Sequence, residues 1–149
     1  MAKYTHGSTR LPRPGWLRAR LAKWALLPYQ LGLGFLLARK VMILTTKGRV
    51  TGKERRTPLW YVREGDAIYC LCGWGASSDW LKNLKADPHV IVQVGRERWE
   101  TAKKLIQEPQ EMERVLSTMQ EKYGRRTVHL FYHMDRLVLV AFPLDNSGK

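Results

Sequence analysis

The stretch of sequence that decides the fold reads Leu44-Thr45-Thr46-Lys47-Gly48-Arg49-Val50-Thr51-Gly52-Lys53-Glu54-Arg55-Arg56-Thr57-Pro58-Leu59. Apolar runs at 41–46 and 58–62 flank it and predict two strands. Gly48 and Gly52 lie between these runs, where a reversing chain needs a positive φ or a close approach of two backbones. The stretch therefore predicts a hairpin.

The predicted hairpin is crowded with positive charge. It holds one acid, Glu54, and five cations, which are Lys47, Arg49, Lys53, Arg55 and Arg56. So many cations in a short hairpin repel one another unless an anion lies among them. Glycine-rich turns expose backbone N–H groups and, with guanidinium groups nearby, form a phosphate cradle. A solvated basic hairpin has the same composition, so the spacing alone leaves both interpretations open.

The charge of the whole chain is unevenly distributed. The 149 residues, the length of a single domain, carry a formal net charge of +13. Residues 1–60 hold 13 Lys and Arg and one acid, a net of +12, whereas residues 61–149 hold 13 and 12, a net of +1. Such asymmetry indicates nucleic acid, an anionic membrane surface or a polyanionic ligand. Because no helix-turn-helix, zinc-finger or RNP-type pattern accompanies the charge, we expect no nucleic-acid partner.

The N-terminal part of the chain has its own character. Residues 1–13 predict a flexible arm, and residues 14–40 predict a basic and apolar helical segment. The apolar run at 24–38 contains Pro28 and Gln30 and is shorter than the roughly 20 apolar residues that a membrane span needs. No small-residue cleavage site follows, which argues against a signal peptide. The segment predicts either a helix that covers one end of the sheet or an interfacial helix on anionic lipid, and both can hold.

From residue 41 the pattern changes to short strands. We expect them at 41–46, 56–63, 67–73, 89–95, 97–106 and 136–143. A short helix capped at Ser78 or Asp79 should end before Pro88, and an amphipathic helix should span 109–123. The fold class is α+β: an antiparallel meander or small barrel of about six strands at 41–144, within a single domain of 1–149, with an N-terminal helix and one or two covering helices.

Side chains for acid–base, nucleophilic or metal chemistry form no recognisable pattern. No nucleophile elbow, Walker A loop or GxGxxG occurs, and the His129 and His133 pair lacks a third ligand, so we expect no metal. Cys70 and Cys72, two residues apart on a strand, point the same way and do not bridge; reduced thiols fit the cytoplasm. Such a chain can still be an enzyme if a bound cofactor supplies the chemistry.

Several spaced motifs resemble one family. The residues are Leu44-Thr45-Thr46, Gly48-Arg49, Thr51-Gly52, Arg55, Thr57-Pro58-Leu59, Gly65-Asp66, Gly73 to Ala76, and Trp80-Leu81-Lys82-Asn83-Leu84 with Ala86 and Pro88. Together with Val90 to Gly95, their order resembles that of the deazaflavin-dependent nitroreductase family over about residues 35–107 and in the closing strand. The resemblance implies a split β-barrel like that of the pyridoxamine-phosphate-oxidase-like flavin-binding proteins.

The resemblance also implies an activity and a cofactor. Family members transfer a hydride from reduced coenzyme F420 to quinones, nitroaromatics or activated enones. Other relatives of the fold use FMN or FAD or bind apolar ligands, so we also consider an FMN- or FAD-dependent reductase and a non-catalytic ligand-binding module on the membrane surface. The acceptor is a small molecule, and we further consider a homodimer and peripheral attachment to the inner face of the membrane through residues 14–40.

Site residues carry over by position. The cradle for the phosphate and oligoglutamate tail would be Lys47, Arg49, Thr51, Gly52, Lys53 and Arg55. Pro58, Leu59 and Trp60 would follow the ring edge, and Gly73, Trp74, Gly75, Ala76 and Ser77 would pack on the deazaflavin, with Trp80 and Asn83 completing the set. Candidate proton donors are Tyr61, Ser77 and Ser78. The chain departs from the family at Val50, where a lysine is typical, and in its short Gly-x-x-Ser-Asp-Trp loop.

Overall fold

Two antiparallel sheets form the body of the protein. The computed structural model describes residues 27, 31, 38–72, 78–132 and 134–144. One sheet has the order β2-β1-β5-β6 and contains β1 (Val41–Lys47), β2 (Glu54–Trp60), β5 (His89–Val94) and β6 (Glu97–Ala102). The other has the order β3-β4-β8-β7 and contains β3 (Val62–Glu64), β4 (Ala67–Cys72), β7 (Lys104–Ile106) and β8 (Val138–Pro143). The α+β class is confirmed.

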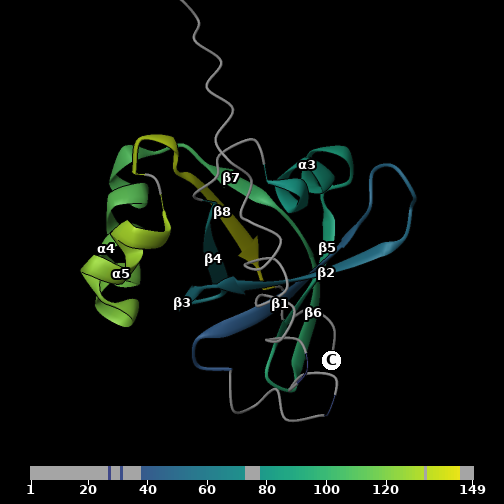
Figure 1. Cartoon of the computed structure of the whole chain (residues 1–149), viewed down its shortest axis with the longest axis horizontal. Coiled ribbons are helices and arrows are strands. Elements are labelled where there is room, and N and C mark those ends of the chain that lie inside the picture. The colour runs from purple at the N-terminus through teal and green to yellow at the C-terminus, as the bar shows by residue number, and fades with distance from the viewer. Residues whose placement is uncertain (1–26, 28–30, 32–37, 73–77, 133, 145–149) are drawn as a thin grey trace, which may run out of the picture.

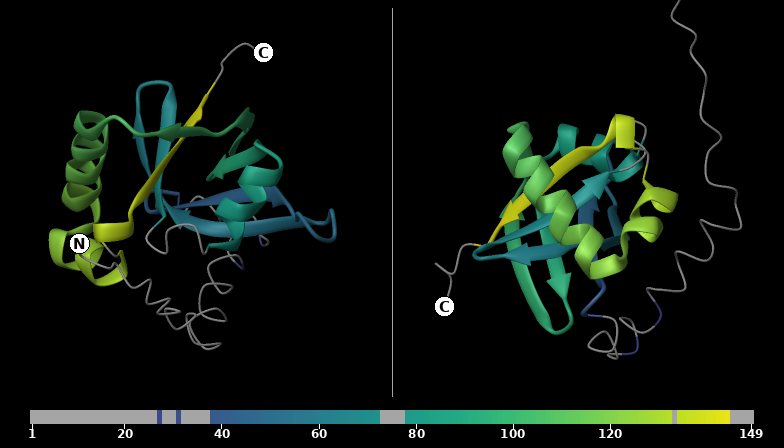
Figure 2. Two further views of the ribbon diagram at one scale, coloured as in Figure 1. Left: turned by 90° about the horizontal axis from the view of Figure 1, so that it is seen from above. Right: turned by 90° about the vertical axis from the view of Figure 1, so that its left-hand side faces the viewer.

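Three α-helices accompany the sheets in the described part of the chain: α3 (Asp79–Ala86), α4 (Pro109–Tyr123) and α5 (Arg125–Phe131). Helices α4 and α5 lie together on one side, whereas α3 lies near the β1–β2 hairpin (Figures 1 and 2). The predicted bounds of α4 are confirmed: Pro109 stands in its first turn, where a missing N–H costs nothing, and Lys122 stands in its last. Helix α5 and a 3₁₀ turn at Met134–Arg136 occupy a region for which the sequence predicted no element.

The number of strands is larger than predicted because two long strands are broken at corners. The predicted strand at 56–63 divides at Tyr61 into β2 of one sheet and β3 of the other. At this corner the Tyr61 N–H donates to the Tyr123 hydroxyl at 3.1 Å instead of to a strand. The predicted strand at 97–106 divides likewise at Lys103, whose N–H donates to the Pro88 carbonyl at 3.1 Å. At each corner the chain leaves one sheet and continues as a strand of the other.

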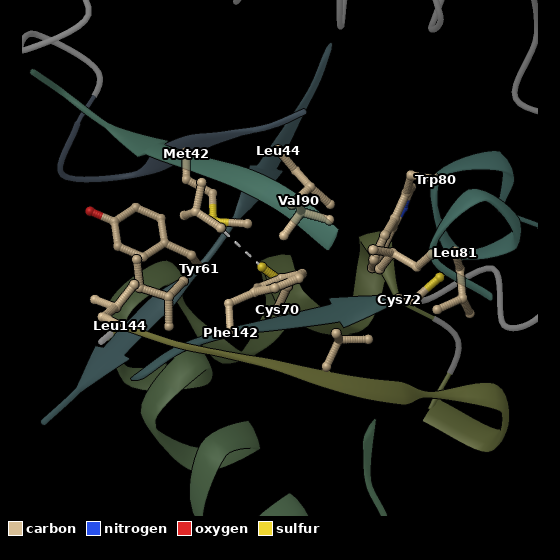
Figure 3. Packing of buried hydrophobic residues seen from close by; sticks show 14 residues of the cluster. Met42, Leu44, Tyr61, Cys70, Cys72, Trp80, Leu81, Val90, Phe142 and Leu144 are labelled. Atoms are coloured by element: carbon tan, nitrogen blue, oxygen red, sulfur yellow. Dashed lines mark hydrogen bonds between the residues drawn. The ribbon is translucent and has the colours of Figure 1, made fainter. Parts of the chain in front are cut away.

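The first hydrophobic core lies between the two sheets. Alternate residues of β1, β5 and β8 face it, and so do both cysteines of β4 (Figure 3). The predicted inward set on β5 is confirmed: Val90 and Val92 are buried in this core, and Val94 packs against it. Cys70 and Cys72 are both free and buried on the same side of β4, as expected. Helix α3 closes the core with Trp80, Leu81 and Leu84.

A second core joins β4 and β8 to α4 and α5. Residues on the other face of the strands, among them Tyr69, Leu71 and Leu139, pack against Val115 and Met119 of α4. Burial of such side chains is worth about 1.5–3 kcal/mol each, which is enough to hold an amphipathic helix on a sheet.

Most of the predicted N-terminal elements cannot be compared with the structure. The arm at 1–13 and most of the segment at 14–40 lie outside the described residues. Among the residues that the structure does describe, no helix has the length and apolar character needed to cross a membrane.

Candidate functional site

The β1–β2 hairpin has the tight tip that its glycines predicted. The strands pair from Val41 with Trp60 to Lys47 with Glu54. The Gly52 N–H donates to the Gly48 carbonyl, and the Gly48 N–H donates to the Lys53 carbonyl, each at 2.8 Å. Gly52 has a φ of +68°, and a Cβ at Gly48 would lie 3.0 Å from the Lys53 carbonyl oxygen. One glycine therefore supplies the positive φ and the other supplies the close approach.

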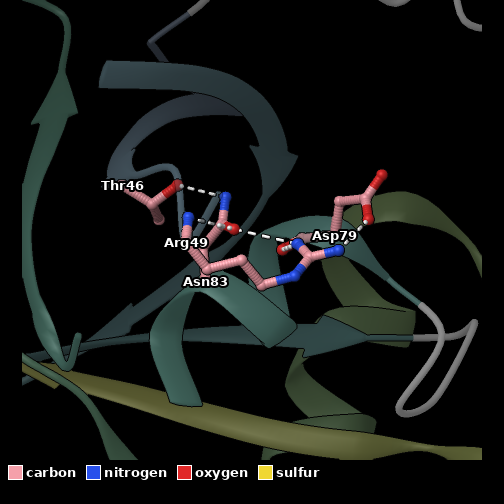
Figure 4. Close-up of polar contacts among 4 residues, drawn as sticks. All are labelled: Thr46, Arg49, Asp79 and Asn83. Carbon is pink, nitrogen blue, oxygen red and sulfur yellow. Dashed lines mark hydrogen bonds and ion pairs between the residues drawn. The ribbon is translucent and has the colours of Figure 1, made fainter. Parts of the chain in front are cut away.

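The tip of the hairpin is attached to α3. The Asn83 Oδ1 accepts hydrogen bonds from the Arg49 N–H at 3.3 Å and from Arg49 Nη1 at 3.0 Å (Figure 4). Arg49 Nη2 forms an ion pair with Asp79 Oδ1 at 3.1 Å. The amide of Asn83 also donates to Thr46 Oγ1 at 3.3 Å. Arg49 thus spans one turn of α3, because residues four apart share a helix face.

The hairpin cations differ in whether a carboxylate lies beside them. Within the described residues, Arg49 is the one hairpin cation that has a carboxylate partner. In the same part of the chain, neither the Val50 nor the Thr51 N–H is a donor in a hydrogen bond. Arg55 pairs with Thr46 across the strands, and its Nε lies 3.6 Å from the position of a Cβ at Gly48. Ammonium, guanidinium and amide donors therefore surround a tip that carries no side chain at Gly48.

The residues predicted along the ring edge lie farther along β2. Leu59 is partly buried against the first core, and Pro58 pairs with Ile43 of β1. Trp60, at the end of β2, stacks on Tyr123 of α4 with ring centroids 4.7 Å apart and an interplanar angle of 3°. Arg55 and Trp60 are five residue steps apart along the strand, about 17 Å. The hairpin tip and Trp60 are therefore two distinct ends of the candidate site.

An aromatic cluster around Trp60 was missed by the sequence analysis. Phe131 meets Trp60 edge to face at 5.2 Å, and Tyr132 lies 6.0 Å from it. Phe131 is 55% exposed, and the neighbouring Leu130 is 79% exposed. Two aromatic residues in a short run, Phe131-Tyr132, were the available signal, but the run has no helical or strand periodicity.

Hydroxyl and amine groups beside Trp60 are held in place. The Tyr61 hydroxyl donates to the Ala38 carbonyl, and the Tyr61 carbonyl accepts from Lys122 Nζ at 2.9 Å. Burial lowers the pKa of Lys122, whose Nζ lies 3.8 Å from the centroid of the Tyr61 ring. Burial also raises the pKa of Tyr123 above its usual range. The ring of Tyr61 is buried in the first core.

The remaining predicted site residues are placed as follows. Trp80 is buried in the first core, and Asn83 holds the hairpin as described. Ser78 precedes α3 and accepts a hydrogen bond from Cys72 Sγ at 2.9 Å. The predicted loop residues Gly73, Trp74, Gly75, Ala76 and Ser77 lie outside the described residues. His133 does too, and no group of three metal-ligating side chains occurs in the part of the chain that the structure describes.

A comparison of the sequence with protein families finds one family that matches most of the chain. The pattern of the family described as F420H(2)-dependent quinone reductase matches residues 19–139. The chain belongs to this family. The match includes the hairpin, α3, the aromatic cluster and the first residues of β8.

Curated and solved relatives agree with this family. An F420H(2)-dependent quinone reductase of Mycobacterium tuberculosis is 38% identical over 69 residues, which cover 44% of this chain and 46% of that protein. The match therefore spans about half the length of the curated relative. A solved F420-H2 dependent reductase (FDR-A) is 23% identical, with a TM-score of 0.58, over 70% of this chain and 94% of that one. A chain described as a domain-swapped dimer is 23% identical, with a TM-score of 0.61, over 85% and 96%. These solved structures confirm the split-barrel fold.

Membership of the F420H(2)-dependent quinone reductase family gives coenzyme F420 as the cofactor. The cations and backbone N–H groups of the hairpin tip are suited to an anionic ligand. Apart from Glu54, the charged side chains of the hairpin are cations, and within the described residues Lys47, Lys53 and Arg55 have no carboxylate partner. Phosphate and carboxylate groups are the ligands that such donors prefer.

A groove adjoins the hairpin and shares residues with it. It is open, encloses about 660 Å³ and is lined by residues of β1, β5 and β6 with part of the hairpin: Thr45, Thr46, Lys47, Gly52, Glu54, His89, Val90, Ile91, Glu100, Thr101 and Ala102. Because two carboxylates line this groove with one lysine, it is less suited to a polyanion than the hairpin tip is.

Proposed function

We propose that this protein is a reductase that transfers a hydride from reduced coenzyme F420 to a quinone. Nitroaromatics and activated enones are further acceptors of the same class. When bound, the reduced deazaflavin supplies the hydride, so the protein needs no nucleophile of its own. The observation that carries the proposal is that four of the five hairpin cations, all but Arg49, have no carboxylate partner among the described residues, in a chain of this family.

The hairpin binds the anionic part of the coenzyme in this proposal. Lys47, Lys53 and Arg55 supply charge, the N–H groups of Val50 and Thr51 supply directed hydrogen bonds, and Gly52 shapes the turn that presents them. Arg49 and Asn83 belong to the same site. The ring then follows β2 from Pro58 through Leu59 to Trp60, and the remaining residues of the proposed set are Gly73, Trp74, Gly75, Ala76, Ser77 and Trp80.

The aromatic cluster offers the acceptor a surface. A quinone is flat and apolar, and Phe131 and Leu130 expose apolar area beside Trp60. The reduced acceptor also needs a proton, for which Tyr61, Ser77 and Ser78 are the proposed donors. Of these, Tyr61 has its hydroxyl bonded to the Ala38 carbonyl, so its proton is exchanged only when that bond opens.

Two finer proposals concern place and assembly. The cationic segment at 14–40 supports peripheral attachment of a cytoplasmic protein to an anionic membrane surface. The dimeric structure of the same fold supports a homodimer.

The test is a titration of purified protein with F420, FMN and FAD, followed by reoxidation of reduced F420 with a soluble quinone. We expect F420 to bind and turn over. Arg55→Ala should weaken F420 binding by about ten-fold or more, since a charge-assisted hydrogen bond is worth about 1.5–3 kcal/mol. Arg126→Ala, on exposed α5, is the matched control and should bind as the parent does.

Two results would contradict the proposal. Equal affinity in Arg55→Ala and the parent would remove the hairpin as the anion site. Binding and turnover with FMN or FAD instead of F420 would make the protein a flavin-dependent reductase, and no turnover with any of the three would favour the ligand-binding module.

A further inference from the structure

Asn83 is a buried polar residue of α3 whose side chain forms hydrogen bonds to residues outside this helix. It is 5% exposed, and its partner Thr46 is 2% exposed; they are the two buried polar residues among those that the structure describes. The side chain of Asn83 faces β1 and the hairpin tip, not the backbone of α3 (Figure 4). A buried amide costs free energy unless its donors and acceptors are used.

Three hydrogen bonds use the Asn83 side chain. Its oxygen accepts from the backbone N–H and the guanidinium of Arg49, and its NH₂ donates to Thr46 Oγ1. These partners are 34 and 37 residues away in the sequence. Asn83 therefore ties the end of β1 and the tip of the hairpin to one point on α3.

The guanidinium of Arg49 is engaged in the same attachment. Nη1 bonds to Asn83 and lies 3.4 Å from the Asp79 carbonyl, and Nη2 bonds to the Asp79 carboxylate. Asp79 is well exposed, with 83% of its side chain accessible, so Asn83 is the buried part of this attachment. The charge of Arg49 is paired with a carboxylate, whereas Lys53 and Arg55 have no such partner in the described part of the chain.

The contact between Asn83 and Arg49 lies next to two backbone N–H groups of the hairpin tip. The amides of Val50 and Thr51 directly follow the residue that Asn83 holds. Repulsion between the cations of the hairpin favours separation of its side chains, and the β1–β2 ladder ends at Lys47 and Glu54. Beyond that pair, bonds within the tip and the contact with α3 set where the tip lies.

We propose that Asn83 is a positioning residue for the phosphate site: it fixes the hairpin tip on α3, so that the donors at Val50, Thr51 and Arg55 keep the spacing that a phosphate needs. In this arrangement Arg49 connects the hairpin tip to α3. The inference rests on the proposed function and assigns the phosphate to the donors that have no partner among the residues that the structure describes.

The test compares Asn83→Ala with Gln110→Ala, which removes an exposed amide from α4. Binding of coenzyme F420 is measured beside binding of the same deazaflavin and ribityl chain without phosphate. Asn83→Ala should bind F420 about ten-fold more weakly or worse and should bind the phosphate-free compound as the parent does. Asn83→Asp keeps the acceptor for Arg49 and should recover part of the loss.

A second measurement needs no ligand. Hydrogen exchange at the amides of residues 49–51 should be faster in Asn83→Ala than in the parent and unchanged in Gln110→Ala. If Asn83→Ala does not fold, Thr46→Val, which keeps the shape of the side chain and removes one of the three bonds, should show the same selectivity with a smaller effect.

The outcomes separate the two proposals. Unchanged exchange in Asn83→Ala overturns the attachment, and equal loss of both ligands overturns the phosphate-positioning role in favour of a general structural one. If the parent protein binds neither ligand, the proposed function fails and the positioning role fails with it, while the exchange data still report on the attachment itself.

Discussion

Gly48 and Gly52 show how single residues shape the hairpin for different reasons. A Cβ at Gly48 would lie only 3.0 Å from the Lys53 carbonyl oxygen. Gly52 has open space at its own Cβ position, with the nearest atom, Lys47 Cε, at 4.0 Å, but its φ is +68°. Replacement of Gly48 is therefore opposed by contact, and replacement of Gly52 by backbone strain.

Gly52→Ala should lower the free energy of unfolding by about 1–2 kcal/mol, because a Cβ is unfavourable in the left-handed region. Gly65 is the matched control: its φ is +56° and nothing lies within 4 Å of its Cβ position, but it lies outside the hairpin. Urea unfolding should show similar losses in Gly52→Ala and Gly65→Ala, whereas F420 affinity should fall in Gly52→Ala alone. Equal F420 affinity in the two variants would contradict a role for the tip.

At the scale of elements, α4 supports the corner between β2 and β3. Tyr123 accepts the N–H of Tyr61, and Lys122 donates to the carbonyl of the same residue. Tyr123 also stacks on Trp60, so the end of one helix holds both the corner and the aromatic cluster. Burial raises the pKa of Tyr123 and of Tyr132, which follows α5.

The raised pKa values of Tyr123 and Tyr132 predict that the packing of α4 and α5 becomes less stable at alkaline pH. Above about pH 10 the unfolded chain loses tyrosine protons that the folded protein keeps. The unfolded state then binds fewer protons, so the free energy of unfolding falls by about 1.4 kcal/mol per pH unit for each tyrosine. The lowered pKa of Lys122 has the opposite effect: the folded protein loses this proton at a lower pH than the unfolded chain does, so the free energy of unfolding rises with pH. This rise ends once pH passes the usual lysine pKa of about 10.4.

Tyr132→Phe tests this interpretation, because it removes the ionising group and keeps the ring beside Trp60. Urea unfolding between about pH 10 and pH 12 should show a shallower decline in Tyr132→Phe than in the parent. Parallel declines would mean that Tyr132 ionises equally easily in both states.

At the scale of the whole molecule, the charge is concentrated before residue 61, where the net is +12 of the total +13. The hairpin accounts for five of the 13 cations in this part, and the others precede β1. The same asymmetry thus serves two proposals: a polyanionic coenzyme at the hairpin and an anionic surface at residues 14–40.

Vesicle binding distinguishes the second proposal from the first. The full chain should sediment with anionic vesicles at low salt, and Arg18→Gln with Arg20→Gln and Lys23→Gln should weaken this, since each cation near such a surface contributes about 1 kcal/mol. F420 affinity should be the same in the two proteins. Binding that survives the three substitutions, or that is equal on zwitterionic vesicles, would contradict attachment by charge.

Local patterns were enough to predict much of this protein. The turn glycines, the alternation of Val90 and Val92, and the span of α4 depend on residues a few positions apart, so the sequence determined them. The excess of hairpin cations is likewise counted directly from the residues, and the anion site that it favours stays a prediction. Family motifs in order predicted the split barrel, which the solved structures confirm.

Tertiary structure alone decided the rest. The corners at Tyr61 and Lys103 exist because each run pairs with two sheets, and no local pattern records which distant strand is the partner. The sequence placed Arg49 among the cradle cations but held no sign that its guanidinium turns toward Asp79 and Asn83. The aromatic cluster likewise brings Trp60 beside residues more than 60 positions away. Such contacts follow from packing of the completed fold, because a side chain's direction is set by whatever the fold brings next to it.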